Sequence, residues 1–185
     1  MPSPIGKGSG ISKSSDCSIR RLVPDDAAAY RELRLRGLSL HPEAFTSSHE
    51  EDSRKSVAAM ATRLAPDGDE AIWGAYAGDR LVALAGLARE TRMKNRHKAT
   101  VFGMYVAPEY GGRGIGRALL AQVIGEARRQ PGLQQLVLTV TDGNAAAAAL
   151  YEKAGFRSFG IEPRAICVDG RHYGKNHMIL FLAQP

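Results

Sequence analysis

The 185-residue chain has few cysteines, few aromatic residues and no long apolar run. Two cysteines, Cys17 and Cys167, are too few for a disulfide framework or a metal site, so we expect a reduced, cytoplasmic setting and no metal. No stretch of 18 apolar residues is present, and we therefore expect no membrane span. Aromatic residues make up 6% of the sequence, and we find no aromatic RNA-binding signature, arginine-rich helix or zinc spacing.

Positive charge is in excess. The formal net charge of +6 indicates an anionic partner. A phosphate-bearing coenzyme would satisfy this charge, and so would nucleic acid. Because no nucleic-acid motif is found, a nucleic-acid-binding protein is a minor hypothesis that rests on charge alone.

The two ends of the chain differ in composition. Residues 1–17 are rich in Gly, Ser and Lys, and such a segment cannot bury enough apolar surface to become ordered. It also lacks the apolar centre of a signal peptide. We therefore expect a disordered tail at residues 1–17 and a single domain at residues 18–185, which is long enough for one core and too short for two.

The most informative segment runs from residue 100 to residue 120. A β-prone run ends at Pro108, which has no N–H to donate to a strand. The glycines that follow are Gly111, Gly112, Gly114 and Gly116. A helix is expected to begin near Gly114, so that its free N–H groups face the glycines, and Arg113 and Arg117 add positive charge. This pattern predicts a phosphate-binding loop, with a diphosphate as its simplest occupant.

Two common phosphate-binding motifs do not fit this loop. A nucleotide P-loop needs Lys and then Ser or Thr after its last glycine, whereas Arg117 and Ala118 follow Gly116. A dinucleotide fingerprint that starts at Gly112 or Gly114 would need a glycine at position 117 or 119, and neither is glycine. For the loop taken alone, a glycine-rich turn without a ligand is the alternative.

Two blocks of sequence together resemble a known family. The first is Val-x-Pro-x-Tyr-x-Gly-Arg-Gly-Ile-Gly-x-x-Leu-Leu at residues 106–120, and the second is Asn-(Ala)5-Leu-Tyr-Glu-Lys-Ala-Gly-Phe at residues 144–156. Their order and separation resemble the GNAT superfamily of acetyl-CoA-dependent N-acetyltransferases. The similarity extends from about Ile19 to the C-terminus and is weakest before Ala71.

The resemblance implies an α/β fold of the α+β type, with a central mixed, mostly antiparallel sheet flanked by helices. The residue pattern predicts strands at 19–23, 71–77, 81–88, 100–106, 136–140, 157–168 and 171–182, and helices at 27–40, 56–64, 114–129 and 145–154. The strand at 136–140 is expected to be parallel to a neighbour. The helix faces expected to be buried are Tyr30, Leu33, Gly37 and Leu40, and Ile115, Leu119, Val123, Ile124 and Ala127.

The resemblance also implies acetyl-CoA as the cosubstrate and a set of residues that hold it. The backbone of residues 104–106 would pair with the pantetheine arm like an added strand. The diphosphate would lie on residues 112–117, and Asn144 would contact the coenzyme through its amide. The implied coenzyme-binding residues are Met104, Tyr105, Val106, Gly112, Arg113, Gly114, Ile115, Gly116, Arg117 and Asn144. Gly111 stands where the family commonly has Arg or Gln.

The catalytic residues are predicted from what amide formation needs. A base must take a proton from the amine, and the leaving thiolate must be protonated. Tyr151 matches the tyrosine that many members use as a general acid, and packing in the core is its alternative role. Glu162 is the first candidate for the base, with His172 or an ordered water chain as alternatives. Some members that acetylate protein N-termini have a glutamate base where this chain has Thr139, which argues against that subgroup.

The leading hypothesis is an N-acetyltransferase that moves an acetyl group to a primary amine of a small molecule, peptide or protein by direct attack on the thioester. The alternative is a catalytically weak acyl-CoA-binding sensor or regulatory module. An amine-bearing acceptor is the expected partner, and the resemblance adds a homodimer, since dimers are frequent in the family. Glu43 and Glu50 either recognise a cationic amine or, as we favour, belong to a solvated helix cap and face.

Overall fold

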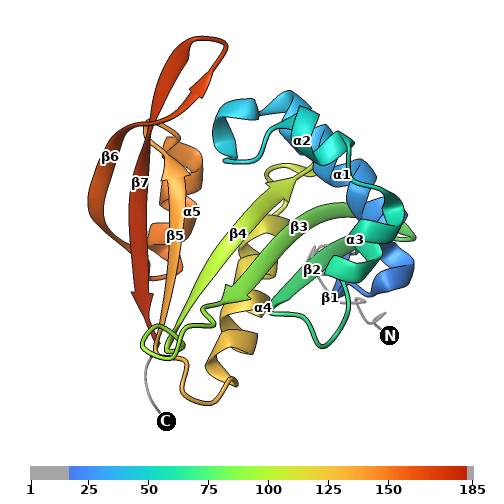
Figure 1. The fold of residues 1–185 in the computed structure, drawn as a ribbon, viewed down its shortest axis with the longest axis horizontal. Coiled ribbons are helices and arrows are strands. Elements are labelled where there is room, and N and C mark those ends of the chain that lie inside the picture. Colours follow the sequence, from blue (N-terminus) through green and yellow to red (C-terminus); the bar gives the residue numbers. More distant parts are fainter. Residues whose placement is uncertain (1–16, 183–185) are drawn as a thin grey trace, which may run out of the picture.

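The computed structural model describes residues 17–182, which form one seven-stranded sheet with helices on both faces (Figure 1). The strand order is β1-β2-β3-β4-β5-β7-β6. Every neighbouring pair is antiparallel except β4 and β5. The mixed, mostly antiparallel sheet flanked by helices is the one that the sequence predicts.

The elements lie close to their predicted positions. The strands are β1 Cys17–Arg21, β2 Glu70–Ala77, β3 Arg80–Arg89, β4 Lys98–Val106, β5 Gln135–Thr141, β6 Arg157–Val168 and β7 Arg171–Phe181. The helices are α1 Ala27–Leu40, α2 His49–Ser53, α3 Val57–Arg63, α4 Ile115–Arg128 and α5 Ala145–Lys153, with short 3-10 helices η1 Pro24–Asp26, η2 Pro42–Ala44 and η3 Pro108–Tyr110. None of the helices in residues 17–182 is long and apolar enough to cross a membrane.

Two local predictions differ from the structure. Strand β1 begins at Cys17, the last residue of the predicted tail, whereas residues 1–16 lie outside the described part of the chain. On α1, the sequence predicts Leu40 on the buried face, but Leu40 is 51% exposed and Leu38 is buried instead. Leu40 is the last residue of the helix, and the chain turns through His41 into η2 directly after it.

The sheet separates two apolar cores. One core lies between the sheet and α4, whose predicted apolar face is fully buried. The other lies under α1 and α3 on the opposite face, and contains Tyr30, Leu33 and Met60. Figure 1 shows α4 on one side of strands β2–β4 and α1–α3 on the other. Burial of both faces explains why β2 and β3 read as nearly continuous apolar runs rather than alternating ones.

Strands β4 and β5 separate along their length. They pair only where Lys98–Thr100 lies beside Gln135–Val137. Farther along, β4 continues with β3 and β5 continues with β7, so the sheet opens between them (Figure 1). Gly103 has φ +62, and the β3–β4 register shifts beside it, which bends β4 as bulges do. The later part of β4 therefore has a backbone edge with no strand partner among residues 17–182.

Candidate active site

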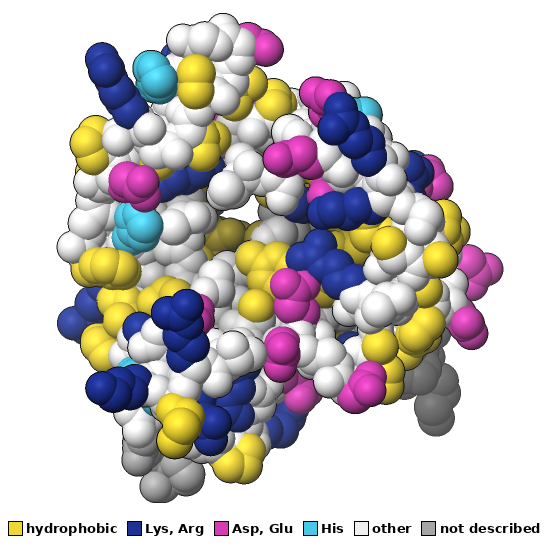
Figure 2. Space-filling view, viewed as in Figure 1, with side chains coloured by type: hydrophobic (Ala, Val, Ile, Leu, Met, Phe, Trp, Pro, Cys, Tyr) yellow, Lys and Arg dark blue, Asp and Glu magenta, His cyan; other side chains and the backbone are white. Residues whose placement is uncertain are grey.

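Two cavities meet where β4 and β5 separate. The smaller, of about 90 Å³, is called the Tyr151 cavity, and the larger, of about 390 Å³, is called the Arg34 cavity. Their shared wall consists of Ala44, Phe45, Val101, Phe102, Gly103 and Thr139. Figure 2 shows the resulting hollow between the two halves of the molecule, with Lys and Arg side chains along its right-hand margin. A ligand in one cavity and a ligand in the other would both contact these shared residues.

The Tyr151 cavity contains three of the predicted site residues: Met104, Asn144 and Tyr151. Tyr151 is 7% exposed and packs edge-to-face on Phe156, with the ring centroids 6.0 Å apart. Burial raises the pKa of its phenol to about 12. Among residues 17–182, the Tyr151 hydroxyl makes no hydrogen bond. It is not fully enclosed either, because the only enclosed side-chain polar atom without a partner in these residues is the Tyr105 hydroxyl. The Tyr151 hydroxyl therefore reaches open space.

Asn144 starts helix α5. Its side-chain oxygen accepts a hydrogen bond from the Ala147 N–H at 3.1 Å, which is the usual contact of an N-cap asparagine. The helix ends at Lys153, one residue before the predicted end, and Gly155 follows the C-cap Ala154 with a φ of +98, which suits glycine as predicted. The oxygen of the Asn144 amide is thus engaged within the chain, and its NH₂ group is the part that is left for a ligand.

The glycine loop brings residues 112–117 to the start of α4, whereas the other two predicted coenzyme-binding residues, Tyr105 and Val106, lie on β4. Gly112 and Gly114 have φ of +72 and +78, a conformation that favours glycine. Gly114 is the N-cap and has no side chain that could cap the helix. A Cβ atom on Gly116 would lie 3.4 Å from Val106 Cγ2, so α4 approaches β4 closely here. Uncapped N–H groups at a helix start form a site for an anion.

Glu162, the predicted base, lines neither cavity. It lies on β6 with its side chain 56% exposed, and its Oε2 is 3.0 Å from Nε2 of His177. His177 lies on β7 opposite Thr139 and lines the Arg34 cavity. His172 pairs with Cys167 beside the β6–β7 turn and lines neither cavity.

His177 is therefore a candidate that sequence reasoning missed. Its place at the cavity depends on how β5 pairs with β7, and no local pattern in the sequence indicates that register.

The family follows from comparison with known proteins. The model of the acetyltransferase (GNAT) family matches residues 34–156. The chain belongs to this family. The GNAT match includes the glycine loop and Tyr151, and it ends before β6 and β7 begin.

Individual GNAT relatives match shorter segments. The ribosomal protein bS18-alanine N-acetyltransferase of Escherichia coli (strain K12) is 48% identical over 59 residues, which are 32% of this chain and 39% of that protein. N-alpha-acetyltransferase RimI of Mycobacterium tuberculosis is 39% identical over 97 residues, which are 52% of this chain and 58% of that protein. The chain thus spans less than two thirds of the length of these curated relatives.

A solved GNAT structure matches over nearly the whole length. An acetyltransferase of the GNAT family from Streptococcus pneumoniae superposes with a TM-score of 0.79 and 24% sequence identity, covering 90% of this chain and 99% of that one. At this level of identity, the match shows the shared fold alone.

In this GNAT chain a third cavity, of about 250 Å³, lies between α4 and α5. Its cationic lining residues are Arg117, Arg128 and Lys153. Arg113, beside the glycine loop, donates to the Glu109 carbonyl at 3.1 Å. A further cavity, of about 640 Å³, lies between α1 and the β2–β3 turn and contains none of the predicted site residues.

A buried lysine binds the main chain of Ala44, one residue of the wall that the first two cavities share. Lys175 of β7 is 4% exposed, and burial lowers its pKa. Its Nζ donates to the carbonyls of Glu43 and Ala44 at 3.1 and 3.2 Å and to Thr141 Oγ1 at 2.9 Å. Thr141 Oγ1 in turn donates to the Glu43 carbonyl at 2.6 Å. These contacts hold η2 against β5 and β7, across the opening of the sheet.

Proposed function

We propose that this chain transfers the acetyl group of acetyl-CoA to a primary amine. The observation that carries the proposal is the separation of β4 and β5 beside the glycine loop, because it puts an unpartnered strand edge, a helix N-terminus and Tyr151 around one opening. The GNAT family uses acetyl-CoA, and the residues present here suit the pantetheine arm and the phosphates of that molecule.

Main-chain groups and cationic side chains support the fit to the coenzyme. The free edge of β4 at residues 104–106 offers N–H and C=O groups to the amides of the pantetheine arm. The start of α4 and the Arg113 guanidinium suit the diphosphate. The cavity with Arg117, Arg128 and Lys153 suits a further phosphate. We infer the coenzyme-binding roles of residues 104–106, 112–117 and Asn144 from this arrangement.

The chemistry needs two proton transfers. The amine nitrogen forms a bond to the thioester carbon, the carbon–sulfur bond breaks, and the sulfur leaves as a thiolate. Tyr151 is proposed to donate its phenolic proton to that sulfur. His177 is proposed to take the amine proton, while Glu162 accepts a hydrogen bond from Nε2 and so orients the ring. Tyr151 lines the Tyr151 cavity and His177 lines the Arg34 cavity, and the two cavities share one wall.

The first test measures thiol release from acetyl-CoA in the presence of amino acids, polyamines, aminoglycosides and short peptides. We expect release that depends on one class of amine and yields the acetylated amine by mass spectrometry. Acetyl-CoA binding without any amine-dependent release would contradict the proposal and favour the alternative, a sensor or regulatory module that binds acyl-CoA.

A double-mutant cycle tests the proton acceptor. We expect His177→Gln to lower kcat by about 10²-fold or more, in the range of general base catalysis, with a small change in coenzyme affinity. Glu162→Gln should lower kcat by less, and the double variant should be no slower than His177→Gln, because Glu162 acts through His177. Steady-state kinetics with the preferred amine supply the kcat values for the cycle.

Two outcomes of this cycle would change the assignment. Unchanged turnover in Glu162→Gln would remove that residue from the mechanism. A large loss in His172→Gln, with His177→Gln unaffected, would transfer the role of base to His172. The homodimer and the cytoplasmic location remain predictions from the resemblance and the composition.

A further inference from the structure

Arg34 is buried beside the acceptor side of the proposed site with its hydrogen-bonding capacity largely unused. Its side chain, on α1, is 10% exposed, and Nε donates to Asp52 Oδ2 at 3.1 Å. Its guanidinium carbon lies 4.9 Å from the Phe45 ring centroid. Within residues 17–182 no hydrogen bond uses either terminal nitrogen. Nη1 lies 3.8 Å from where a Cβ atom on Gly103 would be, so the guanidinium reaches the wall that both cavities share.

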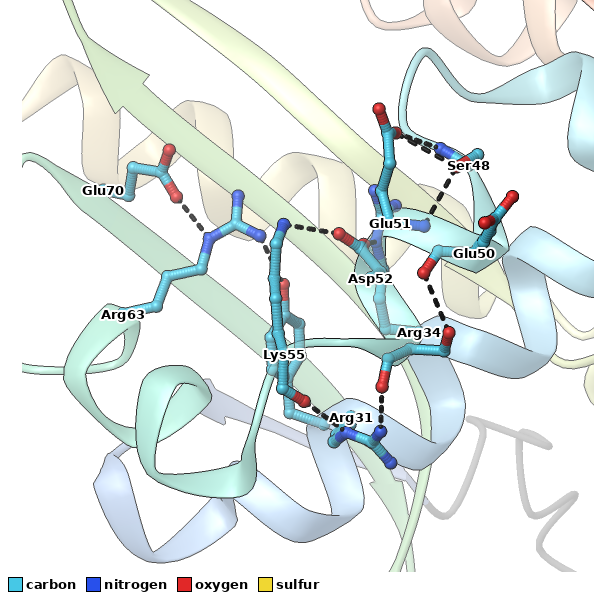
Figure 3. A network of polar contacts seen from close by, with 11 residues as sticks. Arg31, Arg34, Ser48, Glu50, Glu51, Asp52, Lys55, Arg63 and Glu70 are labelled. Atoms are coloured by element: carbon cyan, nitrogen blue, oxygen red, sulfur yellow. Dashed lines mark hydrogen bonds and ion pairs between the residues drawn. The ribbon is translucent and has the colours of Figure 1, made fainter.

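Asp52 does not fully balance this charge. It is 1% exposed and also accepts from Lys55 Nζ at 2.5 Å (Figure 3). Burial raises the pKa of Asp52, but the hydrogen bonds from Lys55 and Arg34 outweigh that effect and hold the pKa below its usual value. The single carboxylate of Asp52 therefore pairs with two cations. Arg34, Lys55 and Asp52 together keep a net positive charge, and the free terminal nitrogens of Arg34 face the cavity.

The rest of the lining lacks a negative charge. Across the described part of the chain, no Asp or Glu side chain lines the Arg34 cavity, whose other ionisable lining residues are Arg63 and His177. Arg63 is already paired with Glu70, at 2.6 Å from its Nε. The acidic residues considered for amine recognition do not reach the cavity either, since Glu43 lies near His41 and Glu50 pairs with Arg54.

We propose that Arg34 binds a carboxylate of the acceptor through its two terminal nitrogens, so that the acceptor is an amine with a carboxylate close by. A guanidinium with two parallel free N–H groups matches a carboxylate in a paired geometry. The carboxylate comes either from a free α-amino acid or from an acidic side chain at a peptide N-terminus. This inference rests on the proposed function, because it takes the acceptor to occupy the Arg34 cavity.

The experiment compares isosteric acceptors with saturating acetyl-CoA. L-leucine is set against L-leucinamide for the α-carboxylate, and the peptide Glu-Ala-amide against Gln-Ala-amide for the side chain, with rates expressed per neutral amine. We expect the acidic member of one pair to have a kcat/KM higher by about 10- to 100-fold, the range of a hydrogen-bonded charge pair. The pair that shows the preference identifies the source of the carboxylate.

Variants connect the preference to the residue. Arg34→Gln should bring the acid-to-neutral ratio to within about threefold of 1, because the ratio reports the lost charge pair. The matched control is Arg36→Gln on the same helix, whose guanidinium pairs with exposed Glu109 and lines neither the Tyr151 cavity nor the Arg34 cavity. It should keep the wild-type ratio. A folded Arg34→Gln that keeps the ratio, or a wild-type protein with no preference in either pair, overturns the inference.

A binding measurement separates this inference from the proposed function and covers an Arg34 variant that fails to fold. Calorimetry on the wild-type protein with coenzyme A compares N-acetyl-L-leucine with its amide, and N-acetyl-Glu-Ala-amide with its Gln counterpart. Tighter binding of one acid by about 10-fold or more supports the carboxylate site even if no acceptor turns over, and only acetyl transfer would then be rejected. Equal binding, or none, rejects the site.

Discussion

Tyr151→Phe is expected to lower kcat for acetyl transfer by about 10²- to 10⁴-fold, the usual contribution of a positioned acid. The change removes only the hydroxyl, which has no hydrogen-bond partner in residues 17–182, and it keeps the ring that packs on Phe156. Stability and coenzyme affinity should therefore change little. Single-turnover kinetics, with binding of acetyl-CoA measured separately, would locate the loss in the chemical step.

The pH dependence of the wild-type enzyme adds a check on Tyr151. Its pKa of about 12 means that the phenol carries its proton throughout an ordinary assay range, so ionisation of Tyr151 should cause no fall in rate between pH 7 and about pH 10.

Tyr173→Phe is the matched control for Tyr151→Phe, since Tyr173 stacks under Arg171 on the β6–β7 hairpin and lines neither the Tyr151 cavity nor the Arg34 cavity. Turnover that survives Tyr151→Phe would leave Tyr151 with the packing role alone.

Asp52→Ala is expected to lower the free energy of unfolding by about 3–5 kcal/mol, because it leaves the buried Arg34 charge without its partner. Figure 3 shows why the loss extends beyond one contact, since Asp52 joins Arg34 to Lys55. Urea denaturation of the variant and the wild type measures the difference in the free energy of unfolding. Glu50→Ala is the control from the same short helix, and its exposed pair with Arg54 should contribute about 0–1 kcal/mol.

The contribution of Asp52 also has a definite pH dependence. Its pKa is lower in the folded protein than in the unfolded chain, so the ionised carboxylate stabilises the fold at pH values above the unfolded-state pKa. That stabilisation should be lost as the pH falls through the folded-state value. Asp52→Ala should therefore lose much of its stability difference from the wild type in acid. A difference that stays constant down to pH 2 would contradict this account.

Local signals predicted the turns and the ends of several elements, whereas the arrangement of the sheet came from the family resemblance. The glycines after Pro108 specify the turn into α4, and Asp169-Gly170 specifies the β6–β7 hairpin, where both residues have positive φ. Asn144 and Gly155 mark the ends of α5. Each of these signals lies within a few residues of the feature it determines, so the sequence carries it without knowledge of tertiary contacts.

The acceptor side could not be predicted in the same way. Arg34 meets Asp52 across 18 positions, and Lys175 meets the Glu43 carbonyl across 132. Before folding, Arg34 and Lys175 are ordinary charged residues in a helix and a strand, and their usual place is in solvent. Glu162 was placed on the right strand, but β6 shifts register near it, and its carboxylate meets His177 rather than either cavity. Only the pairing of distant segments assigns these roles.

The way in which Lys175 holds η2 has an evolutionary consequence. Its ammonium group binds main-chain carbonyls of Glu43 and Ala44, and any residue at those two positions supplies the same oxygens. Side chains along this segment, including the cavity wall at Ala44 and Phe45, can thus be exchanged while the segment stays attached to the sheet. If the cavity holds the acceptor as proposed, descendants of this chain could acquire new acceptors through point substitutions at Ala44 and Phe45, with Lys175 retained throughout.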